Sequence, residues 1–238
     1  MSRWLDLQLN MYYKNIVRGR FIRRPNRFIA EVDLEGRTVV CHVKNTGRCR
    51  ELLTDGAEVI LSRISDPKRR TEYDLVAVYK GETLINIDSQ APNKVFYEWV
   101  RSGHFIDGLT LIRPETVYRD SRFDLYAEAG ERKIFAEGKG VTLEENGVAM
   151  FPDAPTERGL KHLKGLISAA KDGYEAYAVF VIQMKGCRCS TPNRRTDPKL
   201  ADAIREAYLS GVKLLCLYCN VTEDSLAIAD KPHVSFII

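Results

Sequence analysis

Two acidic residues and a lysine interrupt residues 121–140, SRFDLYAEAGERKIFAEGKG, whose alternating apolar residues otherwise predict an ordinary β-hairpin. If Gly130 opens a two-residue turn, the ladder places Asp124 directly opposite Glu137. Their Cβ atoms would then lie roughly 5 Å apart, where like charges repel each other. A cation removes the repulsion: either the ammonium group of Lys139 or a divalent ion that takes one oxygen from each acid.

A divalent ion at this position would bring a definite chemistry, because Mg²⁺ and Mn²⁺ bind hard oxygen ligands and retain several waters. Asp124, Glu137 and the backbone carbonyl of Gly138 would supply the ligands from the protein. Lys139 would orient an attacking water or stabilise the charge that develops on a phosphate. Glu98, on the preceding predicted helix, is a candidate for a further carboxylate, although any exposed helical glutamate would fit as well. This set predicts metal-dependent cleavage of phosphodiester bonds.

The same charges also have an ordinary structural interpretation. Asp124, Glu137 and Lys139 would form, together with Arg122, a solvated network of cross-strand ion pairs, each worth under about 1 kcal/mol. In the cleavage hypothesis, Arg122 positions a phosphate instead. Spacing alone leaves both interpretations open.

The hairpin positions these side chains through its period of two residues. One face is apolar and predicted to be buried, and it carries Phe123, Leu125, Ala127, Ile134 and Ala136. The other face mixes charged and aromatic residues: Asp124, Tyr126, Glu128, Lys133, Phe135, Glu137 and Lys139. That mixture is too polar for a core and too regular for a loop.

Around the hairpin, residues 88–238 alternate between helical and strand patterns, as is typical of an α/β domain. Pro92 can open a helix that Gly103 terminates. Further helices are predicted at 155–173 and 197–211, and further strands at 109–118, 177–184 and 212–221, the last of which is predicted to be the final strand. The strand at 177–184 is apolar almost throughout, as expected of a strand covered on both faces.

Residues 1–87 predict a separate, small β-domain. Turn residues separate five predicted strands, at 27–34, 38–43, 57–64, 73–79 and 82–87, and a short helix is predicted at 47–56. Five strands with one inserted helix match the outline of an OB-like barrel, a fold whose loops and strand faces bind nucleic acid.

The charge of the chain is unevenly distributed. Its formal net charge is only +4, but residues 18–27, RGRFIRRPNR, contain five arginines, and DPKRR follows at 66–70. Such clusters suit a polyanion. The candidate nucleic-acid contacts are Arg18, Arg20, Arg23 and Arg24, although a merely solvated basic face fits the charge equally well.

The composition, with 45% hydrophobic and 29% charged residues in a chain of 238, is ordinary for a soluble globular protein. No run approaches membrane-spanning length, and the N-terminal sequence lacks the pattern of a signal peptide. We therefore expect a cytoplasmic protein that has no membrane partner.

Six cysteines are too few and too scattered to form a disulfide framework in a chain of this length. The pairs at 187 and 189 and at 216 and 219 suggest zinc at first sight. However, residues 216 and 219 lie in a predicted strand, where an offset of three residues points the side chains to opposite faces. We expect reduced structural thiols and no zinc.

Several other polar residues have both a functional and a structural interpretation. His162 lies off the apolar stripe of its helix, where it would contact the site or remain an exposed structural histidine. Arg158 would bind phosphate or support the start of the helix. Gln183 would face the metal site or satisfy a buried backbone group. The candidates in the first domain are explained equally well by the turn NTG: Asn45, Thr46 and Arg48.

Five strings occur in an order that resembles the sugar fermentation stimulation protein A family: HVKNTGRCREL, SRFD, EGKGVTL, FPDAPTERGLKHL and TPNRRTDP. The resemblance spans nearly the whole chain after about residue 13. It implies nucleic-acid binding and an N-terminal OB-like domain joined to a PD-(D/E)xK nuclease-like α/β domain. It also assigns Asp124, Glu137 and Lys139 to the nuclease motif. The sequence departs from the usual pattern at Gly138, where a β-branched residue is usual, and at Gly140, and glycine loosens a strand.

Two functions follow from these observations. The first is a DNA-binding protein that cleaves phosphodiester bonds with Mg²⁺ or Mn²⁺ at the hairpin. The alternative is a non-catalytic DNA-binding regulator of carbohydrate metabolism genes on a nuclease-like scaffold. RNA is an open alternative as the target, and a homodimer would suit a protein that straddles duplex DNA.

Overall fold

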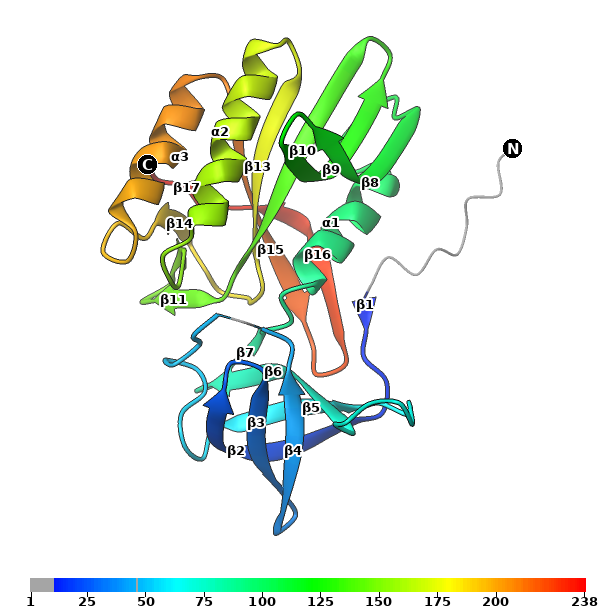
Figure 1. Cartoon of the computed structure of the whole chain (residues 1–238), viewed down its shortest axis with the longest axis vertical. Helices are drawn as coiled ribbons and strands as arrows, with labels where there is room; N and C mark the ends of the chain where they lie inside the picture. The colour runs from blue at the N-terminus through cyan, green and yellow to red at the C-terminus, as the bar shows by residue number, and fades with distance from the viewer. Residues whose placement is uncertain (1–10, 46) are drawn as a thin grey trace.

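The computed structural model describes residues 11–45 and 47–238, which form a β-barrel followed along the chain by an α/β domain (Figure 1). The predicted fold class is therefore confirmed. One cluster of buried apolar residues extends through both parts, and the hairpin between β15 and β16, drawn in orange and red in Figure 1, reaches from the α/β domain to the barrel.

Five strands close the barrel: β2 (Ile16–Asn26), β3 (Ile29–Leu34), β4 (Arg37–Val43), β5 (Glu58–Arg63) and β6 (Tyr73–Lys80). They run in the order β4-β3-β2-β5-β6, and a parallel pairing between β4 and β6 closes the ring. A short strand, β7 (Thr83–Asn86), pairs with β6. Alternate residues such as Ala30, Val32 and Cys41 point inward and are fully buried, as the period of two requires.

The number of barrel strands was predicted correctly, but two details were wrong. The first barrel strand is the arginine-rich β2, whereas 82–87 lies outside the closed ring. This arginine-rich segment was interpreted from the sequence as a basic cluster and not as a strand. Gly19 and Phe21, which alternate with exposed arginines, are nevertheless buried. The helix predicted at 47–56 is a series of turns, because Leu52 and Leu53 both donate backbone hydrogen bonds to the Cys49 carbonyl and the chain then leaves the helical path.

The α/β domain is built on a seven-stranded sheet of order β1-β16-β15-β13-β10-β9-β8. Its strands are β1 (Met11–Tyr12), β8 (Leu111–Tyr118), β9 (Ser121–Ala129), β10 (Arg132–Val141), β13 (Glu175–Ile182), β15 (Lys213–Val221) and β16 (Ser225–His233). Helix α1 (Ala91–Arg101) covers one face, and α2 (Glu157–Lys171) and α3 (Pro198–Leu209) cover the other (Figure 1). Strand β13 is parallel to both of its neighbours and buried almost throughout, as predicted.

A second sheet of four short strands was not predicted. It consists of β11 (Leu143–Glu145), β12 (Val148–Phe151), β14 (Cys189–Pro192) and β17 (Ser235–Phe236). The prediction that 212–221 is the final strand was also wrong, because β16 follows it as an antiparallel partner. Within the described residues, no helix is long and apolar enough to cross a membrane.

Candidate functional site

The β9–β10 hairpin has the predicted register as far as the pair Leu125–Ala136. Gly130 has a positive φ of 61°, as expected of a glycine that opens the turn. Beyond Ala136 the predicted Asp124–Glu137 pair does not form. Instead the Gly138 N–H donates to Asp124 Oδ2 at 2.8 Å, so a side chain takes the place of a ladder bond. β10 continues beside β13 after its ladder with β9 has ended.

The two acids consequently contact different helices. Glu137 contacts His162 of α2, whereas Asp124 Oδ1 accepts a hydrogen bond at 2.7 Å from Asn93 in the first turn of α1. The prediction that Phe123 shares a face with Leu125 was wrong: Phe123 packs beneath α2, whereas Leu125 belongs to the cluster beneath α1. The change of face between these residues occurs where the ladder with β10 ends.

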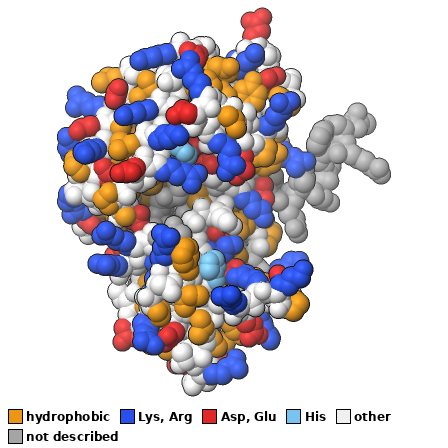
Figure 2. All heavy atoms as spheres, in the orientation of Figure 1, with side chains coloured by type: hydrophobic (Ala, Val, Ile, Leu, Met, Phe, Trp, Pro, Cys, Tyr) orange, Lys and Arg blue, Asp and Glu red, His pale blue; other side chains and the backbone are white. Residues whose placement is uncertain are grey.

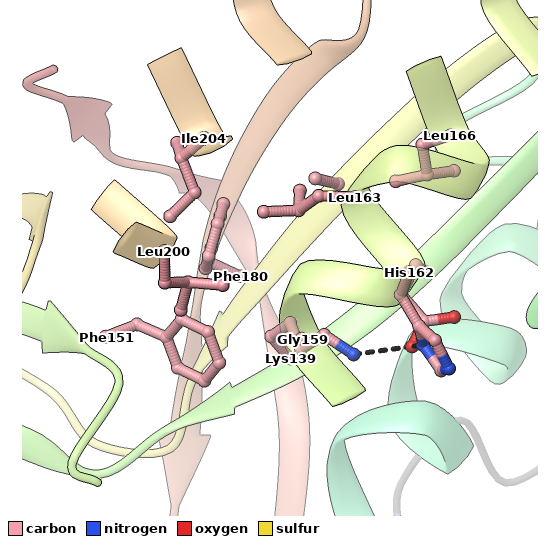
Figure 3. A pocket seen from close by; sticks show the side chains of 11 residues that line it. Lys139, Phe151, Gly159, His162, Leu163, Leu166, Phe180, Leu200 and Ile204 are labelled. Atoms are coloured by element: carbon pink, nitrogen blue, oxygen red, sulfur yellow. Dashed lines mark hydrogen bonds and ion pairs between the residues drawn. The ribbon is translucent and has the colours of Figure 1, made fainter. Parts of the chain in front are cut away.

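Glu137 is the most buried charge of the site, with 2% of its surface exposed. Its Oε1 accepts from Lys139 Nζ at 2.5 Å and contacts His162 Nδ1 (Figure 3). Burial alone would raise the pKa of Glu137, but His162 and Lys139 outweigh it and hold that pKa below its ordinary value. The other oxygen, Oε2, is buried and has no hydrogen-bond partner among the described residues.

His162 is therefore not an exposed structural histidine. It is 6% exposed and lines a small pocket together with Phe151, Leu163 and Phe180 (Figure 3). The prediction that it lies off the buried stripe of α2 was wrong: it shares the buried face with Leu163 and Leu166 and contacts Glu137 there. Sequence reasoning missed Asn93 altogether; its signal is a polar residue in the turn that Pro92 opens.

Asp124 is half-buried, and burial together with the nearby Glu137 raises its pKa to about 6. The shift is one-sided: Glu137 raises the pKa of Asp124, whereas the pKa of Glu137 itself is lowered. Because Glu137 is buried, it does not belong to a solvated network of ion pairs. Arg122 does fit that interpretation, since its exposed side chain lies 3.6 Å from that of Glu115.

Each glycine of the EGKG string lies against a side-chain amide. A Cβ atom on Gly138 would lie 2.5 Å from Asn93 Oδ1, and one on Gly140 would clash with Gln183 Oε1 and lie 2.8 Å from Pro92 Cγ. The space that a β-branched side chain would fill is therefore occupied by residues of α1 and by Gln183, which follows β13. These contacts explain sterically why glycine occupies positions 138 and 140, where the family pattern usually has other residues.

Gln183 is buried and satisfies polar groups of the neighbouring barrel, as one of its two interpretations proposed. Its Nε2 donates to Asn86 Oδ1 at 2.9 Å and to the Asp88 carbonyl at 3.1 Å. Asp88, itself fully buried, forms an ion pair with Lys44 of the barrel at 2.9 Å. Further ion pairs join the two parts: Lys80 with Glu144, and Arg18 with Glu223.

The oxygen donors of Asp124, Glu137 and the Gly138 carbonyl fit a hard divalent cation. No cluster of three His, Cys, Asp or Glu side chains suited to a metal occurs in residues 11–45 and 47–238. Two carboxylates, one with an unpartnered buried oxygen, and a backbone carbonyl would leave the other positions to water or phosphate, as is usual for Mg²⁺. Glu98 makes no recorded contact with Asp124 or Glu137: burial raises its pKa, Lys94 is the charge that opposes the shift, and its Oε2 is buried without a partner among the described residues.

The predicted basic contacts separate into paired and unpaired groups. Arg18 pairs with Glu58 and Glu223, Arg23 pairs with Glu31, and Arg20 reaches the Gly56 carbonyl at 3.4 Å. Arg24 donates to four backbone carbonyls, those of Arg27, Asn45, Gly47 and Arg48.

Asn45 uses its side chain to accept a hydrogen bond from the Gly47 N–H, as the turn interpretation expected. Arg48 and Arg158 are exposed and form no ion pair within the described chain. Thr46 lies outside the described residues. Of the predicted basic contacts, these two arginines are the ones left free to meet a ligand.

Two of the strings that carry the family resemblance dock on each other. Asp197, from TPNRRTDP, caps α3 through the Leu200 N–H and accepts a second bond from the Thr156 N–H of FPDAPTERG, each at 3.0 Å. Asn193 donates to the Pro152 carbonyl at 3.0 Å. These hydrogen bonds hold the start of α2 in place. They thereby also position His162, which follows in the same helix.

The six cysteines are free thiols, four of them buried. Cys216 packs in the cluster beneath α2 and α3, and Cys219 in the cluster beneath α1, so this pair points to opposite faces. Burial raises the pKa of Cys216 to about 12.

Comparison with known proteins gives a consistent result over nearly the whole chain. Residues 22–87 match the model of the SfsA N-terminal OB domain, and residues 90–225 match that of the sugar fermentation stimulation protein RE domain. A sugar fermentation stimulation protein homolog of Desulfitobacterium hafniense (strain Y51) is 57% identical over 95% of this chain and 99% of its own. The homolog of Ruminiclostridium cellulolyticum is 53% identical over 94% and 99%.

A solved structure is also similar. The structure of Pyrococcus furiosus SfsA in complex with Ca²⁺ superposes with a TM-score of 0.87 and 27% identity, and the match covers 98% of this chain and 100% of that one.

Proposed function

This chain belongs to the sugar fermentation stimulation protein family, and we propose that it is a DNA-binding phosphodiesterase whose PD-(D/E)xK site is formed by Asp124, Glu137 and Lys139. One observation carries the proposal: a buried carboxylate oxygen, Glu137 Oε2, has no partner in the described chain and lies beside a second carboxylate. An unsatisfied buried acceptor is costly, and a bound cation would satisfy it. The similar P. furiosus SfsA was solved in complex with Ca²⁺, which supports the binding of a divalent cation but does not identify its ligands.

Asp124, Glu137 Oε2 and the carbonyl of Gly138 would hold Mg²⁺ or Mn²⁺. Because a strand residue directs its N–H and C=O to the same side, the bond from the Gly138 N–H to Asp124 places the Gly138 carbonyl on that side of β10 as well. When bound, the ion would lower the pKa of a coordinated water and neutralise charge on the scissile phosphate.

The surrounding side chains orient the two carboxylates. His162 and Lys139 both engage Glu137 Oε1, which leaves Oε2 directed to the cation. Asn93 holds one oxygen of Asp124, and the Gly138 N–H holds the other. Lys139, about one-fifth exposed, is close enough to solvent to stabilise the developing phosphorane charge. Arg122 and Arg158, both exposed, are proposed to position the phosphate backbone of the substrate.

The test measures cleavage of labelled single- and double-stranded DNA with Mg²⁺, Mn²⁺ or EDTA. The variants are Asp124→Asn, Glu137→Gln and Lys139→Met, with Glu131→Gln at the exposed turn of the same hairpin as the matched control. We expect products that need metal, a loss of at least about 10³-fold in the three site variants, since metal and lysine each contribute several kcal/mol, and native rates in the control.

Calorimetric titration of Mn²⁺ or Ca²⁺ provides a second readout that does not depend on turnover. Asp124→Asn and Glu137→Gln should each weaken binding by at least tenfold. Intact DNA under every condition, with cation binding that ignores both substitutions, would refute the enzyme and leave the alternative of a DNA-binding regulator on a nuclease-like scaffold.

A further inference from the structure

Helix α1 begins without a side-chain cap from the residue that precedes it. In the described chain, α2 and α3 are capped by the side chains of Thr156 and Asp197, which accept from N–H groups of the first turn. The side chain of Gln90, at the same position before α1, makes no such bond. Because the first N–H groups of a helix have no partner within it, another group has to satisfy them at the start of α1.

Asp88 satisfies these groups. Its Oδ1 accepts from the Gln90 N–H at 2.9 Å, and its backbone carbonyl accepts from the Ala91 N–H at 3.2 Å. The carboxylate is fully buried, and the side chain of Gln183 donates to the Asp88 carbonyl at 3.1 Å. The position of the first turn of α1 therefore depends on how Asp88 is held.

The barrel holds Asp88 through Lys44, the residue that follows β4. The Lys44 ammonium group forms an ion pair with Asp88 Oδ2 at 2.9 Å, and the Lys44 side chain is 21% exposed. The Lys44 carbonyl accepts from both the N–H and the hydroxyl group of Ser89, each at 2.9 Å. One residue of the barrel thus binds the segment before α1 through its side chain and through its backbone.

Other cations of the barrel contact other elements. Lys and Arg side chains lie on both sides of the constriction between the barrel and the α/β domain (Figure 2). Lys80 forms an ion pair with Glu144 of β11, and Arg18 forms one with Glu223 in the turn between β15 and β16. Of these three cations, Lys44 is the one that contacts the segment before α1.

The first turn of α1 reaches the hairpin at two points. Asn93 Nδ2 donates to Asp124 Oδ1 at 2.7 Å. Pro92 lies against β10, where a Cβ atom on Gly140 would be 2.8 Å from Pro92 Cγ. Because a hydrogen bond weakens steeply when its geometry is lost, a shift of this turn would loosen Asp124.

We propose that Lys44 is a positioning residue for the site on the hairpin: through Asp88 it fixes the first turn of α1, in which Asn93 orients Asp124 for cation binding. The inference rests on the proposed function and makes the barrel a structural part of the cation site. Partners that orient a metal ligand raise the affinity of a site for its metal, even where they do not contact the metal themselves.

Calorimetric titration of the full chain with Mn²⁺ tests the proposal. Lys44→Met removes the ammonium group and should weaken Mn²⁺ binding about fivefold, a typical coupling between parts of one protein. Lys80→Met, which breaks the ion pair of the barrel with β11, is the matched control and should leave the affinity unchanged. An equal loss in both variants, or no loss in Lys44→Met, would overturn the proposal.

The route through Asn93 makes a sharper prediction. In the background of Asn93→Ala, where Asp124 has already lost its donor, Lys44→Met should weaken Mn²⁺ binding by less than about twofold further. Losses that multiply, as expected of independent sites, would overturn this route.

Lys44→Met leaves the Asp88 carboxylate buried without its cation, which can unfold the chain. A double variant, Lys44→Met with Asp88→Asn, removes both charges and with them the ion pair between the barrel and the start of α1. It should show the same loss of about fivefold. Native affinity in the double variant would show that Lys44 only neutralises Asp88, and would overturn the positioning role.

Hydrogen exchange in EDTA gives a readout that does not depend on the proposed function. The Gly138 N–H donates to Asp124, so its exchange should be at least about fivefold faster in the double variant than in Lys80→Met. Equal exchange in these two variants would overturn the positioning role of Lys44. Absence of Mn²⁺ binding by the native chain would instead refute the proposed cation site, and the exchange of the Gly138 N–H would still decide whether Lys44 positions Asp124.

Discussion

Strand β2 carries arginines that are exposed and paired, whereas the β9–β10 hairpin carries carboxylates that are buried and incompletely paired. Arg23 is 69% exposed at its side chain and has Glu31 beside it; Glu137 is 2% exposed and leaves one oxygen without a partner among the described residues. Exposed pairs contribute little because water and salt screen them. The comparison teaches that a few charges spaced within an apolar strand mark a site better than a dense charge cluster does.

The largest effect on stability should come from His162. His162→Ala removes a buried partner of Glu137 and leaves space above an apolar layer, so the free energy of unfolding should fall by about 3 kcal/mol. Arg23→Ala, its counterpart in β2, should change it by less than about 1 kcal/mol. Urea unfolding of both variants measures the contrast, and equal losses would break the comparison.

Substituting the two glycines of β10 by alanine should lower stability by different amounts. Gly140→Ala forces a methyl group against buried Gln183 and Pro92 and should cost about 2 kcal/mol. Gly138→Ala meets only the end of the exposed Asn93 side chain, which can move, so stability should fall by less than about 1 kcal/mol.

Displacing Asn93 should nevertheless weaken Ca²⁺ binding, because Asp124 loses a hydrogen bond. A double-mutant cycle of Gly138→Ala with Asn93→Ala tests this, since coupling is expected only if both act through the same contact. Additive effects on Ca²⁺ affinity would contradict the contact.

Arg24 should be the one arginine of β2 whose substitution clearly lowers stability. Because its guanidinium binds four backbone carbonyls, Arg24→Ala should cost about 1.5 kcal/mol, whereas Arg20→Ala, with one long hydrogen bond, should be nearly neutral. Hydrogen exchange should show faster exchange of the Gly47 N–H in Arg24→Ala alone. Identical behaviour of the two variants would show that the carbonyl contacts contribute nothing.

Glu175, the first residue of the central strand β13, should have a small effect on stability that depends on pH. Hydrogen bonds from Arg132 and Lys213 outweigh its partial burial and lower its pKa to about 2. A folded pKa below the unfolded value stabilises the fold above about pH 4.5, and this stabilisation is lost as pH falls towards 2. Glu175→Gln should therefore cost about 1 kcal/mol at pH 7, after screening, and nothing near pH 2; a constant difference across urea titrations would refute this.

Local patterns in the sequence predicted much of the fold. The hairpin register followed from one glycine turn, and the three helices from apolar spacing with Pro or Gly at their ends. Strand β2 was missed because its outward arginines resemble a basic tail. The four-stranded second sheet pairs distant segments, β12 with β14 and β14 with β17, and such short strands carry too few residues to show a period.

The site was predicted in part for a similar reason. Asp124, Glu137 and Lys139 lie on two adjacent strands, so spacing relates them. Asn93 and His162 reach the acids from helices on opposite faces of the sheet, and nothing in their own segments indicates which face they meet. The divergence of β9 from β10 after Ala136 depends on tertiary packing, so pairing rules alone placed Asp124 opposite Glu137.

The contacts of Asp88 decide which barrels can be combined with this α/β domain. Its fully buried carboxylate receives Lys44 and the Tyr13 hydroxyl on one oxygen and the Gln90 N–H on the other. A barrel transplanted from another protein would have to bring a lysine at that position, or bury a charge with no counter-ion. The barrel and the α/β domain are thus not interchangeable modules but a matched pair, whose recombination should succeed only when both sides of this contact are exchanged together.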